Sequence, residues 1–284
     1  MFKKIFFVTA LLLASLLSAK PVVIASIAPV GYLAKAVGGD KIEVQSLAKG
    51  DVHSYEPKPN DMKAVAKARI FIAAGLEFEE AWIPRFKASA KNLVVVKSDA
   101  KIAKLKEERE EQAEHDEKHE AHADPHVWLN PMLAITMARN ISDALIDMDK
   151  ANKDFYLENF QKLMNDLLAF DESAKESLAG LKNRKFVVYH PAWGYFAAHY
   201  DLEQISIERN GKEPKIDEMA STVKMIKDEN IKVIFADPNR SQKSAQVLAS
   251  QTGAKVELLD PLGYNLLENL KIAVRAIKDA NSPK

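Results

Sequence analysis

Histidines are the residues of this chain best suited to chemistry, and four of the seven fall within twelve positions, from 115 to 126. His115, His119 and His122 lie in an acidic run, residues 107–122, which offers them no apolar core to pack against. His126 instead follows a proline and precedes an apolar run, so its backbone should be held in place. We therefore predict two roles: His126 is one ligand of a buried metal site, and the other three form a low-affinity collector of metal ions.

The acidic run also has a simpler interpretation as a solvated, flexible loop. Residues 107–120 contain eight acidic and two basic side chains, and such charge runs are usually solvated. The three histidines favour weak metal binding within it. Ordering a flexible segment costs about 1–2 kcal/mol of backbone entropy per residue, so we expect no high-affinity site there.

Two isolated histidines follow predicted strands elsewhere in the chain. His53 lies in a proline-containing loop after the predicted strand 41–47, and His190 directly follows the predicted strand 185–189. In open parallel α/β sheets, ligands bind outside the carboxyl ends of the strands. His126 lies just before a predicted helix start. We therefore expect the side chains of His53, His126 and His190 to meet at one metal ion.

Three neutral imidazoles favour zinc, which takes four tetrahedral ligands with Zn–N distances of about 2.0–2.1 Å. Manganese favours more oxygen ligands. The chain has no cysteine, so the candidates for the fourth position are Asp260, Glu56, Asp237 and water. We favour Asp260, because it ends a predicted strand in the second half of the chain. Glu56 is close in sequence to His53 and is better placed to orient that ring without touching the metal. Asp237 is better placed to cap the turn at Pro238.

The predicted elements place these residues in an α/β fold with mostly parallel sheets. Short β-branched runs alternate with amphipathic helices in both halves of the chain. A helical pattern over 155–181 predicts a strut between two lobes, with an ordinary long core helix as the alternative. The predicted organisation is a signal peptide at 1–19, an N-terminal lobe at 20–150 with the acidic histidine loop, a linking helix at 151–181 and a C-terminal lobe at 182–284.

The first 19 residues have the features of a secretory signal peptide. Lys3 and Lys4 precede an uncharged, mainly apolar stretch over 5–17, and Ala19 precedes the expected cleavage. This stretch is shorter than the roughly 20 residues that cross a bilayer, so a membrane anchor is the less favoured alternative. No later stretch is apolar enough to span a membrane. Without cysteine no lipid anchor can follow the cleavage, so we expect a periplasmic protein that is not a lipoprotein.

Composition argues against nucleic acid as a partner. The chain has 284 residues, of which 47% are hydrophobic and 28% charged, which is typical of a globular protein of one or two domains. Lys+Arg and Asp+Glu both number 40, and the sequence shows no clustered basic face. We expect a monomer that binds no nucleic acid.

These motifs resemble the zinc- and manganese-binding solute receptors of ABC transporters (cluster A-I, ZnuA-type). The resemblance covers essentially the whole mature chain. It rests on VHSYEPKPND (52–61), the acidic histidine loop, DPHVWLNP (124–131), YHPAWGYF (189–196), ERNGKEP (208–214) and LDPLG (259–263). It implies two lobes joined by a long, rather rigid helix, with the metal in the cleft between them. It also implies delivery of the metal to an inner-membrane permease driven by a cytoplasmic ATPase.

The resemblance assigns residues as well as a fold. His53, His126 and His190 fall on the three metal-binding histidines of the family, and Asp260 falls on its carboxylate. Manganese receptors of the family carry glutamate at the third histidine position, so His190 points to zinc. The chain lacks the cysteine pair found near the C-terminal end of some zinc members. The implied function is high-affinity binding of Zn²⁺ for uptake, without enzymatic turnover.

Other functions compete with this interpretation. Three histidines with an open fourth position also form catalytic zinc sites, which makes a zinc-dependent hydrolase one alternative. However, the chain has no HExxH motif and no general base separate from the proposed ligands, and Asp260 in the fourth position would close the site. A manganese or broad divalent-metal receptor is the alternative within the family. An adhesin or surface metal buffer is a third, but the missing lipid-carrying cysteine argues against surface anchoring.

Overall fold

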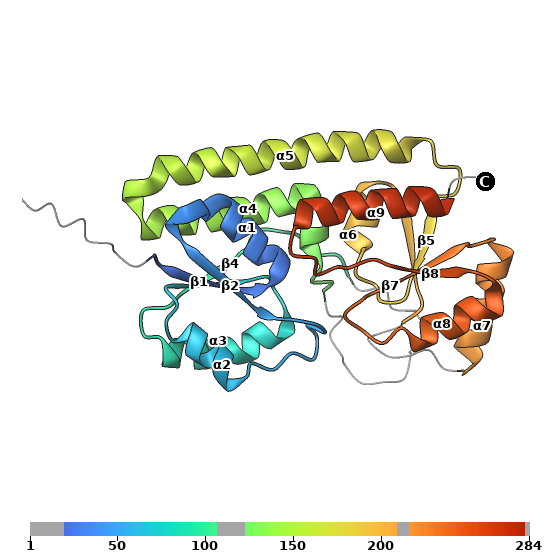
Figure 1. The fold of residues 1–284 in the computed structure, drawn as a ribbon, viewed down its shortest axis with the longest axis horizontal. Helices are drawn as coiled ribbons and strands as arrows, with labels where there is room; N and C mark the ends of the chain where they lie inside the picture. Colours follow the sequence, from blue (N-terminus) through green and yellow to red (C-terminus); the bar gives the residue numbers. More distant parts are fainter. Residues whose placement is uncertain (1–19, 107–122, 209–215, 282–284) are drawn as a thin grey trace, which may run out of the picture.

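The computed structural model describes residues 20–106, 123–208 and 216–281. In these ranges the chain forms two α/β lobes side by side, with one long helix running over both (Figure 1). The predicted fold class, two lobes with parallel sheets, is confirmed. Among the described helices, none has the length and apolar character to cross a membrane.

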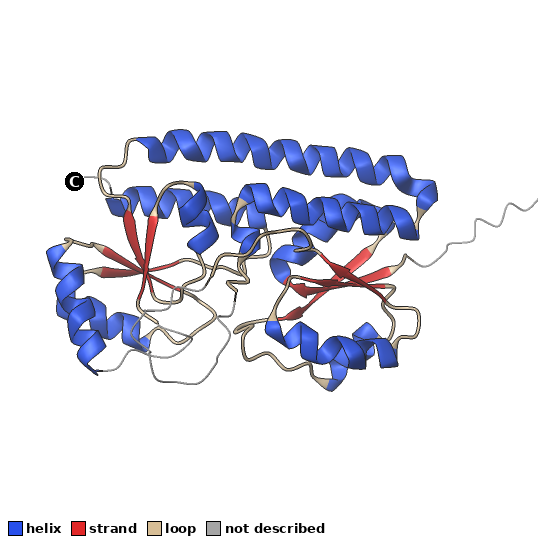
Figure 2. Cartoon of the chain, turned by 180° about the vertical axis from the view of Figure 1, so that it is seen from behind, coloured by secondary structure: helices blue, strands red, loops and turns tan. Residues whose placement is uncertain are grey.

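The N-terminal lobe is built on a four-stranded parallel sheet of order β2-β1-β3-β4. Its strands are β1 (Val22–Ile27), β2 (Glu43–Ala48), β3 (Ile70–Ala73) and β4 (Val94–Lys97). Its helices are α1 (Ala28–Gly38), α2 (Pro59–Val65), α3 (Glu77–Ser89) and α4 (Pro131–Met148), with short turns η1 (Gly39–Lys41), η2 (Val127–Leu129) and η3 (Lys150–Asn152). Figure 2 shows helices on both faces of this sheet, which explains why β3 is buried along its whole length.

The C-terminal lobe repeats the same strand order, β6-β5-β7-β8. Its strands are β5 (Lys185–Val188), β6 (Glu203–Ser206), β7 (Val233–Ala236) and β8 (Lys255–Leu258). Its helices are α6 (Gly194–His199), α7 (Ile216–Asp228), α8 (Lys243–Thr252) and α9 (Leu266–Asn281). In both lobes the chain reverses direction across the sheet between the first and third strands, and ligands bind at such switch points.

The long helix α5 (Lys153–Ala179) has 27 residues, so it is about 40 Å long. It packs against α1 and α4 of the first lobe and against α9 of the second. Its buried residues recur at three- and four-residue intervals, among them Tyr156, Phe160, Leu163 and Leu167. The predicted helix spanning both lobes is therefore present, beginning and ending about two residues earlier than its sequence pattern indicated.

One hydrophobic core passes through both lobes. A single cluster of buried residues includes Val23 and Trp128 from the first lobe, Leu167 of α5, and Phe186 and Leu270 from the second lobe. Two smaller clusters lie on the opposite faces of the two sheets. The lobes therefore share apolar packing, and this packing holds the loops at their facing edges in a defined relation.

Candidate metal centre

Three histidines meet where loops of the two lobes face each other. His53 follows β2, His126 precedes η2 and His190 follows β5. One nitrogen of each ring lies within 4.8 Å of the others, and the ring centroids are 5.1–5.5 Å apart. Ligands of a tetrahedral zinc ion are about 3.3 Å apart, given the usual Zn–N distance. The three nitrogens are thus close enough to one another to be candidates for ligands of a single ion.

Tight turns hold two of these histidines. Before His53, Gly50 adopts a φ of 91°, which favours glycine. The Asp51 carboxylate then accepts the backbone N–H of His53 at 3.1 Å. His126 is held in the same way, because its backbone N–H donates to Oδ1 of Asp124 at 2.9 Å. These Asx-type turns fix the backbone of both residues, whose side chains line the same pocket.

Buried carboxylates contact the far side of two rings. Nδ1 of His126 lies 2.8 Å from Oδ1 of Asp124, and Nδ1 of His190 lies 2.7 Å from Oε2 of Glu208. When Nδ1–H donates to a carboxylate, Nε2 is left unprotonated and free to bind a metal. Sequence reasoning missed both partners. A signal existed for Asp124, which stands two residues before His126 in the DPH motif, and Glu208 is the first residue of the ERNGKEP motif, two positions after β6.

The cluster found in the described part of the chain consists of the three histidines alone. Glu56 is not part of it and is exposed to solvent. The carboxylate that contacts the backbone of His53 is Asp51 rather than Glu56. The structure therefore offers no support for Glu56 as the residue that orients His53.

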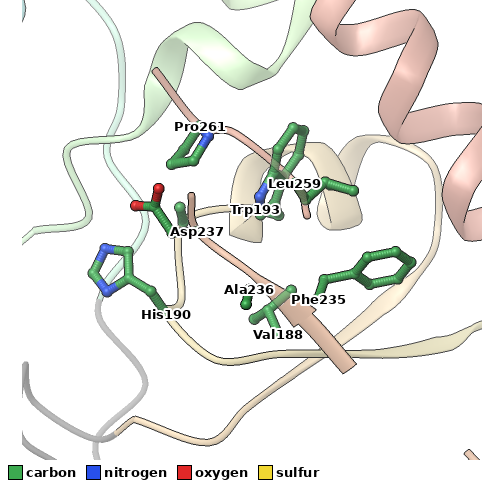
Figure 3. Close-up of a pocket in the computed structure, with 9 residues that line it drawn as sticks. Val188, His190, Trp193, Phe235, Ala236, Asp237, Leu259 and Pro261 are labelled. Atoms are coloured by element: carbon green, nitrogen blue, oxygen red, sulfur yellow. The ribbon is translucent and has the colours of Figure 1, made fainter. Parts of the chain in front are cut away.

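Another carboxylate, Asp237, lies next to the cluster, and Asp260 is linked to Asp237 through Asn239. Asp237 lines the same pocket as the three histidines, and Figure 3 shows its carboxylate beside the ring of His190. Asp260 accepts hydrogen bonds at Oδ1 from Nδ2 of Asn239, at 2.8 Å, and from the backbone of Leu262, at 2.9 Å. Asn239 also donates its backbone N–H to Oδ1 of Asp237, which thus has the turn-capping contact expected of it. In each carboxylate, Oδ2 is the oxygen not engaged in these bonds.

A comparison with protein families gives a match over nearly the whole described chain. The family model described as "ZnuA: Zinc-uptake complex component A periplasmic" matches residues 23–280. The chain belongs to the ZnuA family.

Individual relatives and solved structures match nearly the whole chain. The high-affinity zinc uptake system protein ZnuA of Bacillus subtilis (strain 168) is 31% identical over 277 residues, which is 91% of this chain and 86% of that protein. A zinc-bound deletion mutant of ZnuA gives a TM-score of 0.85 at 34% identity, over 93% of this chain and 99% of that one. The laminin-binding protein of Streptococcus agalactiae, described as having adhesin and metal-transporting activity, gives 0.81 at 26% identity, over 92% and 99%.

In this ZnuA family member, the guanidinium group of Arg240 contacts both lobes beside the histidines. Arg240, just after β7, donates from Nη1 to Oε2 of Glu208 at 2.7 Å and from Nη2 to Oδ2 of Asp51 in the other lobe at 3.2 Å. Nη1 also lies 2.6 Å from Nδ1 of His190. Donation to that nitrogen would place the ring proton on Nε2 and block a metal. Metal binding at His190 therefore requires the tautomer in which Nδ1–H donates to Glu208.

The environment keeps His53 and His190 in the form that binds metal. Desolvation, followed by the neighbouring charge of His126, lowers the pKa of His53 to about 4. The same two causes lower the pKa of His190 to about 2. Both rings are therefore neutral near pH 7, and a neutral imidazole is the form that ligates zinc.

Some predicted residues lie outside the described residues. These are His115, His119 and His122 of the acidic run and the expected signal peptide at 1–19. Their assignments stay predictions.

Proposed function

We propose that this protein is a periplasmic receptor that binds one Zn²⁺ ion through His53, His126 and His190 and delivers it to the permease of an ABC transporter. The observation that carries the proposal is the convergence of three imidazoles from both lobes. Membership of the ZnuA family supports the transport role. In this proposal the ion is cargo, the protein acts as a monomer without catalytic turnover, and residues 1–19 direct its secretion without a lipid anchor.

The donor set supports zinc ahead of manganese. Three imidazole nitrogens suit Zn²⁺, whereas Mn²⁺ prefers a larger share of oxygen ligands. The carboxylates behind His126 and His190 add to this preference, because they raise the basicity of the rings they contact. With Asp260 as a fourth ligand, the site would carry a net charge of about +1 and would be closed to a substrate.

A chelator-competition titration with zinc and manganese in parallel tests this proposal. It should use the mature chain and a variant lacking residues 107–122. Lys106 and Ala123 form an antiparallel bridge, so a short turn can join the cut ends. We expect one tight zinc site in both proteins, much weaker manganese binding, and a lower total zinc stoichiometry in the deletion variant.

Two outcomes of this titration would contradict the proposal. Loss of tight zinc binding in the deletion variant would move the main site into the acidic run. Equal affinity for the two metals would make the protein a broader divalent-metal receptor.

We also propose Asp260 as the fourth ligand, with Asp237 and water as the alternatives. The backbone of Leu262 and the side chain of Asn239 fix Oδ1 of Asp260, which leaves Oδ2 to reach an ion. Asp260→Asn is expected to weaken zinc binding about tenfold, since a charged ligand is lost. It should weaken manganese binding more, because manganese depends more on oxygen. Both affinities are measured by competition with a chelator.

Asp237→Asn is the matched control for this prediction. Asp237 lines the same pocket and also accepts hydrogen bonds from Asn239 at Oδ1. A larger loss at Asp237 than at Asp260 would transfer the ligand role to Asp237. No loss in either variant would leave water in the fourth position.

A further inference from the structure

The hydroxyl of Tyr195 joins the two lobes close to the metal centre. Tyr195 lies on α6 of the C-terminal lobe and is 3% exposed. Its O–H donates to the carbonyl of Asp124 at 2.8 Å, and its oxygen accepts the N–H of Leu105 at 2.8 Å. Burial raises the pKa of Tyr195 to about 12, so the hydroxyl keeps the proton that it donates. Both residues that it contacts belong to the other lobe.

The two contacted segments are themselves paired. The backbone N–H of Asp124 donates to the carbonyl of Leu105 at 3.0 Å, and Lys106 and Ala123 form an antiparallel bridge beside them. Tyr195 therefore bonds to both members of this pair at once. Two hydrogen bonds therefore fix the backbone of Asp124, one at its carbonyl and one at its N–H, and a third ties Leu105 to the same tyrosine hydroxyl.

Asp124 transmits this position to a proposed ligand. Its Oδ1 accepts both the backbone N–H of His126, at 2.9 Å, and Nδ1 of the same residue, at 2.8 Å. Gly194, the residue before Tyr195, packs closely against the Asp124 carboxylate. A Cβ at this position would lie 3.1 Å from Oδ2 of Asp124. The chain of contacts from Tyr195 to the ring of His126 thus has a single intermediate residue.

We propose that Tyr195 is a positioning residue of the metal site, which holds Asp124 and thereby sets the orientation and tautomer of His126 from the opposite lobe. The inference rests on the proposed zinc-binding function. It also explains why the segment 189–196 matters twice: His190 enters the site directly, and Tyr195 acts on His126 through Asp124. One segment of the C-terminal lobe then controls two of the three histidines.

Tyr195→Phe tests the inference, because it removes the hydroxyl and keeps the ring. Changes to the partners of metal-binding histidines typically cost about 10- to 100-fold in metal affinity. Tyr195 stands one residue further away, so we expect zinc binding to weaken about 3- to 10-fold in chelator competition. In the metal-free protein, the substitution should convert His126 from an Nδ1-protonated ring to a mixture of tautomers. ¹⁵N NMR of the imidazoles measures this change.

Tyr156→Phe is the matched control. Tyr156 lies on α5, outside the histidine cluster, and is also fully buried. Its hydroxyl donates to Oδ2 of Asp149 at 3.0 Å. This variant should lose a similar hydrogen bond while retaining wild-type zinc affinity and a wild-type His126 spectrum. If Tyr195→Phe does not fold, Gly194→Ala supplies a second variant, since its new methyl group should displace the Asp124 carboxylate and weaken zinc binding in the same range.

The results separate this inference from the proposed function. Wild-type zinc affinity in Tyr195→Phe would overturn the inference, and so would weaker binding with an unchanged His126 spectrum, which would indicate general loosening. In either case, a large loss in His126→Ala would leave the proposed function in place. Unchanged affinity in His126→Ala would instead remove His126 from the site and overturn both.

Discussion

Replacing His126 with alanine is expected to weaken zinc binding by more than about 100-fold. His126 is the most buried of the three proposed ligands, at 4% exposed, and its ring has a carboxylate partner 2.8 Å away. Loss of such a partner alone typically costs about 10- to 100-fold in metal affinity, so loss of the ligand itself should cost more. The substitution also leaves the Asp124 carboxylate buried without the imidazole N–H.

Chelator competition measures this loss directly, and thermal unfolding gives an independent reading. A ligand that binds only the folded state stabilises it by about 2.7 kcal/mol when present at 100 times its Kd. The rise in Tm on adding zinc should therefore disappear in His126→Ala. His199→Ala is the control, because His199 pairs with Asp171 of α5 at 2.6 Å and is outside the cluster. A zinc-induced rise in Tm that persists unchanged in His126→Ala would show that the ion binds elsewhere.

Trp128→Ala is expected to lower the free energy of unfolding of the metal-free protein by about 3–5 kcal/mol, the usual cost of truncating a buried tryptophan. Trp128 is fully buried in the core shared by the lobes. Its Nε1–H donates to the carbonyl of Pro261 in the other lobe at 2.7 Å. The variant loses apolar packing and also leaves that carbonyl without this donor.

Urea unfolding of three variants separates these contributions. Trp128→Phe keeps most of the packing and loses the hydrogen bond, which is worth about 1 kcal/mol net. Trp82→Ala is the control, because Trp82 is only partly buried and stacks against Arg85 near the surface. It should cost less than half as much as Trp128→Ala. Equal losses at the two tryptophans would mean that the junction between the lobes adds no special stability.

Much of the fold was predictable because its signals are local. Alternating β-branched runs and amphipathic helices indicate βα units, and the apolar spacing of α5 marks its length and its buried face. The three histidines could be grouped because each follows a strand or precedes a helix, and the ends of parallel strands meet at one edge. The structure brings these three rings together.

The missed features depend on contacts between distant segments. Arg240 reaches Asp51 across 189 positions of sequence, and Trp128 reaches Pro261 across 133. Glu208 contacts His190 only because β6 lies beside β5. No periodicity or spacing encodes such partners, since they follow from strand order and from the packing of one lobe on the other. For the same reason, the order of the strands in each sheet could not be derived from the pattern alone.

The apolar core that continues from one lobe into the other determines how the protein unfolds. Each lobe keeps a smaller buried cluster of its own, but the largest cluster is shared, because α5 packs on both lobes and α9 contacts both α5 and α1. Separating the lobes would expose this shared interior to water, at a free-energy cost proportional to its apolar area. The two lobes should therefore unfold together as one cooperative unit. A chain that contains either half alone would expose a large apolar surface and should aggregate.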